Sequence, residues 1–174
     1  DSLSSGLAEA TGIAATIHSD AFDLGTLTGP VVIDATAQIA GSTDQTIASL
    51  LAGVVEAHVE ASVEESQIGI TSAKLSSDSQ TSTLTGTISR TDGVLSVDVT
   101  SDLLSTVLPA AARPVLADRT KVTASLSRSA DGSLAADAFA LSSGDLNASG
   151  KATVSGDTIT GTATGELADI GRLS

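Results

Sequence analysis

The side chains in this sequence best suited to bind a metal or to take part in catalysis are two histidines and a group of glutamates. His18 and His58 lie in separate alternating segments without metal-ligand spacing, so we interpret both as polar surface residues. The four glutamates between positions 56 and 65 could offer oxygens to calcium, but no calcium-binding loop motif surrounds them. The sequence therefore predicts a solvated acidic strand face here and no metal site.

Two serine pairs, Ser76–Ser77 and Ser142–Ser143, are the remaining candidates for nucleophilic chemistry. Neither pair lies in a nucleophile-elbow motif, and neither has a matched histidine and acid. The chain contains no cysteine, which excludes a disulfide framework, a thiolate metal site and a thiol nucleophile. We expect no enzymatic activity and no cofactor.

Composition narrows the function classes further. The 174 residues fit one domain or one stretch of a repeat array. A net charge of -13 argues against binding to nucleic acid. The 41% hydrophobic content is too high for simple disorder, yet aromatic residues make up only 1%. No window is apolar enough to span a membrane, and a chain that starts at Asp1 and lacks Met is expected to be a piece of a larger protein.

Alternation with period two is the dominant pattern in the elements that carry these side chains. Val55, Val59 and Val63 alternate with Glu56 and Glu60, which predicts a strand with one dry and one wet face. The same pattern predicts further strands at 31–39, 81–88, 95–100 and 158–164. Turn signals at 91–93, 130–132 and 155–157 predict antiparallel hairpins between neighbouring strands.

Three short stretches, at 47–54, 103–108 and 167–173, show helical spacing instead. An internal repeat accompanies them: Leu75–Ser77 recurs as Leu141–Ser143, and Gly86 aligns with Gly150. We therefore treat 1–174 as a single segment of a repeat array, with approximate repeats at 6–54, 55–119 and 120–174.

These patterns predict an all-β fold: an elongated, curved antiparallel sheet of repeats with a groove-like shape and two or three short helices. The inward rows are aliphatic and lack aromatic bulk, so the apolar face is either an open hydrophobic trough or an ordinary filled core. The residues expected to line the trough are Val31, Ile33, Ile39, Val55, Val59, Val63, Ile68, Ile70, Leu84, Ile88, Leu95, Val97, Val99, Val122, Leu126, Val154 and Ile159.

Three segments resemble the repeats of TamB proteins and the wider AsmA-like group. They are Lys121–Leu134, Leu141–Val154 and Gly161–Leu173, and Asp98–Leu116 resembles a TamB-type helix between repeats. The resemblance implies a periplasmic β-repeat region, shaped like a taco, of a Gram-negative protein anchored in the inner membrane. It also implies roles in phospholipid transport and outer-membrane biogenesis, including protein assembly or secretion with a TamA-like outer-membrane barrel that other parts of the chain would bind.

The resulting functional hypothesis is a non-enzymatic hydrophobic groove for phospholipid acyl chains. The alternative is a structural β-repeat of an acidic bacterial adhesin or stalk, which would have a closed sandwich, calcium stabilisation and no lipid. Exposed sheet edges also lead us to expect self-association of the isolated piece.

Overall fold

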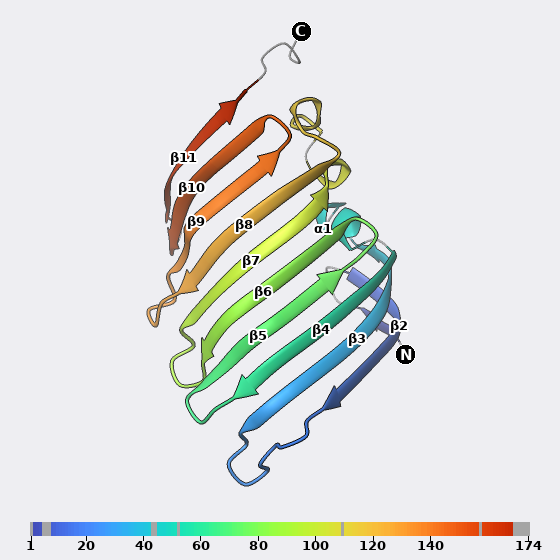
Figure 1. The fold of residues 1–174 in the computed structure, drawn as a ribbon, viewed down its shortest axis with the longest axis vertical. Coiled ribbons are helices and arrows are strands. Elements are labelled where there is room, and N and C mark those ends of the chain that lie inside the picture. The colour runs from blue at the N-terminus through green and yellow to red at the C-terminus, as the bar shows by residue number, and fades with distance from the viewer. Residues whose placement is uncertain are drawn as a thin grey trace.

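The computed structural model describes residues 2–4, 8–42, 45–51, 53–108, 110–156 and 158–168. They form one 11-stranded sheet in which every strand pairs antiparallel with its sequence neighbours (Figure 1). The strands are β1 (Ser2–Ser4), β2 (Ala8–His18), β3 (Gly29–Ser42), β4 (Gly53–Val63), β5 (Gln67–Ser76), β6 (Gln80–Ser89), β7 (Leu95–Leu104), β8 (Arg119–Arg128), β9 (Leu134–Ser143), β10 (Leu146–Ser155) and β11 (Thr158–Leu167).

The expected all-β class and single antiparallel sheet are confirmed. The alternating segments lie inside β3, β4, β6, β7 and β11, because alternation lets each strand keep its aliphatic side chains on one face. Gly93 and Gly132 lie in the predicted hairpin turns with φ of 70° and 88°, a region that glycine enters without a Cβ clash. The sheet is open and does not roll up on itself, since β1 and β11 each have one neighbour.

β-Bulges interrupt the ladders at two comparable places. In β5 the register shifts between Ile70 and Ala73. In β9 the extra residue is Asp137, because Ala136 and Ala138 pair with consecutive residues of β8. A bulge bends its strand and increases the local twist. The two bulges are about as far apart in the sequence as Leu75–Ser77 is from its recurrence at Leu141–Ser143. The repeat boundaries themselves stay a prediction.

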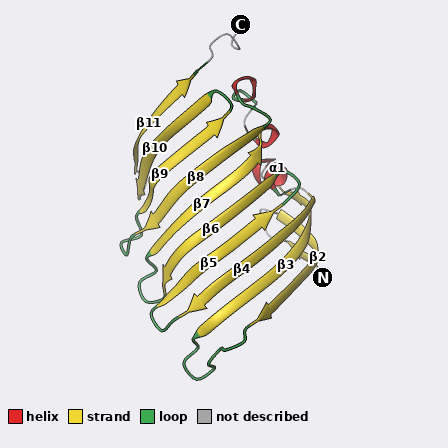
Figure 2. Cartoon of the chain, viewed as in Figure 1, coloured by secondary structure: helices red, strands yellow, loops and turns green. Residues whose placement is uncertain are grey.

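Among the described residues, helical structure is confined to one six-residue α-helix and two single turns (Figure 2). They are α1 (Gln45–Leu50) and the 3₁₀ turns η1 (Ser105–Val107) and η2 (Arg113–Val115). α1 overlaps the first predicted helical stretch at 47–50, but the prediction is wrong at Val54, which lies in β4. No helix in the described ranges is long and apolar enough to cross a membrane. In the third stretch, Leu167 is the last residue of β11 and not helical, and positions 169–173 lie outside the described residues.

The predicted helix at 103–108 is wrong over its first half. Leu103 and Leu104 extend β7, where they pair with Thr120 and Arg119 of β8. Leu103 is also one of two buried hydrophobic residues in the described part of the chain. Pairing and burial within the sheet stabilise the extended form more than a short helix can stabilise itself.

Candidate functional site

The ladder registers sort the side chains into two faces of opposite character. Directly paired residues of an antiparallel sheet lie on the same face, so the register can be followed from strand to strand. Val59 pairs with Ile33 on one side and with Ala73 on the other. Followed in this way, every residue predicted to line a trough lies on one face, which we call the aliphatic face.

One row across the aliphatic face, the central row, contains no polar side chain from β2 to β11. Its members are Ile17, Ile33, Val59, Ala73, Leu84, Val99, Ala124, Phe139, Gly150 and Ala163. At about 4.8 Å between strands the row extends about 43 Å. A bilayer core of about 30 Å implies about 15 Å for one acyl chain. The central row is therefore longer than two acyl chains laid end to end.

No second layer of strands covers the aliphatic face in the part of the chain that the structure describes. Only Val97 and Leu103 are buried among the described hydrophobic residues, at 7% and 9% exposure. Ile17 and Ile159, near the two edges, are 69% and 74% exposed. A filled sandwich core would bury most such side chains. The face instead presents a contiguous apolar surface, which in soluble proteins commonly marks an interaction site.

Side-chain bulk on the aliphatic face falls towards the C-terminal edge. β3 and β4 place valine or isoleucine there with alanine between them, whereas the middle of β11 places Gly161, Ala163 and Gly165 there between Ile159 and Leu167. At Gly150 the sheet leaves no room for a side chain: a Cβ would lie 2.3 Å from the carbonyl oxygen of Thr162 and 2.6 Å from Cζ of Phe139. The Phe139 ring therefore occupies the space over Gly150 on the aliphatic face.

Short helical elements cap the strand ends on one side of the sheet. The last turn of α1 is held by serines of the β5–β6 turn: Ser77 Oγ donates to the carbonyl of Leu50 at 2.7 Å, and Ser79 Oγ donates to that of Ser49 at 2.8 Å. These bonds satisfy carbonyls that a helix end leaves without partners. In Figure 1, α1 is drawn behind the sheet, beside the ends of β6 and β7.

A buried hydroxyl cluster lies where β7, β8 and β9 meet the capping turns. Thr120 is fully buried, and its Oγ1 lies 2.9 Å from Ser105 Oγ and 2.8 Å from Ser143 Oγ. Ser143 Oγ also accepts the backbone N–H of Ala117 at 2.9 Å. This cluster was not predicted, because the recurrence of Leu75–Ser77 as Leu141–Ser143 does not by itself show that Ser143 lies beside Thr120 and Ser105. Its bonds are structural and join the connection between β7 and β8 to the sheet.

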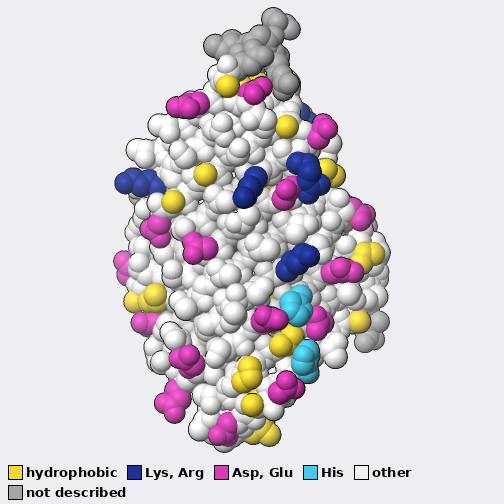
Figure 3. Space-filling model, in the orientation of Figure 1, with side chains coloured by type: hydrophobic (Ala, Val, Ile, Leu, Met, Phe, Trp, Pro, Cys, Tyr) yellow, Lys and Arg dark blue, Asp and Glu magenta, His cyan; other side chains and the backbone are white. Residues whose placement is uncertain are grey.

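The opposite face, the polar face, carries hydroxyl and acidic side chains (Figure 3). His58 pairs with Asp34 across β3 and β4, with its Nδ1 2.6 Å from Asp34 Oδ1, and its Nε2 lies 3.5 Å from Glu60 Oε1. The hydrogen bond to Asp34, and then that to Glu60, raise the pKa of His58. No group of three or more potential metal ligands gathers within the described ranges.

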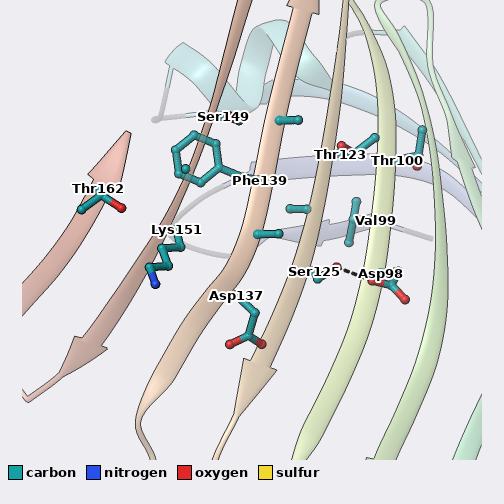
Figure 4. Close-up of a pocket in the computed structure, with 14 residues that line it drawn as sticks. Asp98, Val99, Thr100, Thr123, Ser125, Asp137, Phe139, Ser149, Lys151 and Thr162 are labelled. Atoms are coloured by element: carbon teal, nitrogen blue, oxygen red, sulfur yellow. Dashed lines mark hydrogen bonds between the residues drawn. The ribbon is translucent and has the colours of Figure 1, made fainter. Parts of the chain in front are cut away.

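A shallow hollow of about 640 Å³ crosses the polar face between β7 and β11 (Figure 4). Its lining includes Asp98, Ser125, Asp137, Lys151 and Thr162. Ser125 Oγ donates to Asp98 Oδ1 at 2.6 Å. Hydroxyl and alanine side chains make up most of the remaining lining.

Fold and faces together define an open antiparallel meander with one uncovered aliphatic face. A scan against protein-family models, a search of curated proteins and a search of solved structures each find no match to this chain.

Proposed function

We propose that the aliphatic face binds the acyl chains of phospholipids and that the protein is non-enzymatic. The observation that carries this proposal is the central row, which is continuous, aliphatic and uncovered by a second sheet. Burial of a methylene is worth about 0.8 kcal/mol, so an acyl chain is held on such a surface without any specific polar contact.

The open geometry favours transfer over storage. A chain lying on one face is covered on about half of its surface, so each methylene would contribute about 0.4 kcal/mol and a chain of about 15 methylenes about 6 kcal/mol. Such a free energy corresponds to dissociation constants of tens of micromolar. A bilayer surrounds the same chain on all sides, so a lipid held on this face returns readily to a membrane.

Charge also supports the proposed orientation of the lipid. The protein carries 21 acidic and 8 basic residues, and Asp34, Glu56 and Glu60 share the polar face. An anionic headgroup is repelled from that face. Acyl chains are therefore directed to the aliphatic face, with headgroups in water at its margin.

The biological setting that we propose is a periplasmic segment of a TamB or AsmA-like protein, whose full chain is anchored in the inner membrane. In this setting the aliphatic face carries phospholipid between the inner and outer membranes. A TamA-like barrel would bind other parts of the full chain. The support for this setting is the resemblance of the repeat segments together with the long aliphatic face.

Two variants at neighbouring positions of β6 test the acyl-chain proposal. Leu84 lies in the central row, whereas the adjacent Thr83 is exposed on the polar face and pairs with Lys74. After gentle purification from a Gram-negative host, wild type and Thr83→Glu should retain phospholipid in native mass spectrometry, and Leu84→Glu should lose it. Circular dichroism checks that both variants fold. Equal lipid retention in a folded Leu84→Glu protein would contradict the proposal.

A further inference from the structure

β11 resembles β7 in its length and in how it pairs with the strand before it. Both strands have ten residues, both follow a hairpin turn, and both pair with the preceding strand without a bulge. Asp102–Leu103 near the end of β7 matches Glu166–Leu167 at the end of β11. The two strands differ in one respect: β8 pairs with the far side of β7, and no described strand pairs with the far side of β11.

The far edge of β11 lacks the usual features that discourage strand pairing. Natural edge strands are often very short or carry lysine, proline or a bulge. β11 has none of these, and Glu166 is its one charged residue. Every residue from Thr158 to Glu166 is exposed. The opposite edge of the sheet is different, since β1 has only three residues.

The β7–β8 ladder shows which kind of strand fits such an edge. It runs without interruption from Leu95 to Leu104. Asp102 pairs with Lys121 in this ladder, and Asp102 Oδ1 also lies 2.5 Å from Nε of Arg119. Two cations of β8 therefore face the acidic residue that corresponds to Glu166.

Transferring this register to β11 gives complementary pairs along the edge. Glu166 would face a lysine equivalent to Lys121. Gly161 and Gly165, which leave space on the aliphatic face, would lie opposite residues equivalent to Leu126 and Val122. Aliphatic side chains of the added strand would then continue the aliphatic face.

We propose that the outer edge of β11, which no described strand pairs with, is a β-augmentation site for an extended strand of the β8 type. The partner strand has about ten residues, aliphatic side chains at alternate positions and a cation opposite Glu166. This inference does not depend on what the aliphatic face binds.

The test uses the intact chain and a synthetic peptide with the sequence of residues 119–128, blocked at both ends. We expect the peptide to slow hydrogen exchange of β11 amides. Replacing the lysine of the peptide by glutamate should weaken binding about two- to fivefold, the range for a cross-strand charge pair. The Glu166→Lys chain should reverse this preference. Ala163→Pro should abolish binding while the rest of the sheet keeps its protection, because the backbone N–H of Ala163 points away from β10.

Three outcomes would overturn the proposal. The first is protection that appears only on strands other than β11. The second is equal binding of the lysine and glutamate peptides to both the wild-type and the Glu166→Lys chains. The third is a homodimer that pairs β11 with β11 and excludes the peptide, since this would identify a second copy as the occupant.

Discussion

Replacement of Gly86 by alanine should destabilise the sheet strongly. Gly86 pairs with Val97 in the β6–β7 ladder and has a φ of 152°. A Cβ at this position would lie 2.2 Å from the carbonyl oxygen of Ser96 and 2.7 Å from Cα of Val97. Both contacts are with backbone atoms, so no side-chain rotation relieves them.

The expected cost combines two effects. Backbone strain at a residue forced into an unfavourable region costs about 1–3 kcal/mol. Steric overlap in a packed position costs about as much again. The total is about 2–6 kcal/mol. With a urea slope of about 2 kcal/mol/M, the unfolding midpoint of Gly86→Ala should fall by about 1–3 M.

Gly165→Ala is the matched control in β11. Its Cβ would meet no atom closer than 3.7 Å, which is ordinary van der Waals contact. This variant should therefore change stability by less than about 1 kcal/mol, because the loss of unfolded-chain entropy favours alanine. A Gly86→Ala protein with the wild-type urea midpoint would refute the close strand approach at this position.

Three further predictions concern the polar face, the hydroxyl cluster and a turn. Asp34→Asn should lower the pKa of His58 in an NMR titration, because the bond to Asp34 is the main cause of its rise; an unchanged pKa would contradict this. Since the folded-state pKa of His58 is raised, the stability from this contact is present at low pH and is lost as pH rises through that pKa. Thr120→Val should cost about 1–3 kcal/mol in urea unfolding, because buried partners lose a hydrogen bond, whereas Thr123→Val on the polar face should cost less than about 0.5 kcal/mol. The hydrogen bond from the backbone N–H of Ser133 lowers the pKa of Asp131, so the wild-type protein should lose stability as pH falls through that pKa. The urea midpoint of Asp131→Asn should fall less over the same pH range.

The strands and their faces were predictable from the sequence because each face needs one type of residue at every second position. From Val55 to Val63 in β4, apolar residues alternate with polar residues without exception. The turn glycines lie where the chain reverses. A one-residue slip would move all the aliphatic side chains of a strand to the other face, so the pattern excludes such slips. It does not distinguish slips of two residues, and it did not predict the bulges in β5 and β9.

Features that depend on contacts between distant strands were not predictable. The helical spacing of Leu103 and Leu104 suggested a helix, but pairing with β8 extends them as a strand. Ser143 resembled other exposed serines in sequence, yet the register places it beside Thr120 in the buried cluster. The recurrence of Leu75–Ser77 as Leu141–Ser143 was the available signal, because Ser77 also bonds to a capping element.

NMR paramagnetic relaxation provides the most direct test of acyl-chain binding to the aliphatic face. The probe is a phospholipid with a nitroxide on one acyl chain, added to protein with methyl labels on valine and leucine. Val59, Leu84 and Val99 lie in the central row, whereas Val32 and Val54 pair with Glu60 and Gln38 on the polar face. We expect strong broadening of the three central-row methyl signals and sharp signals from Val32 and Val54. Equal broadening of both sets, or none in either, would contradict acyl-chain binding to the aliphatic face.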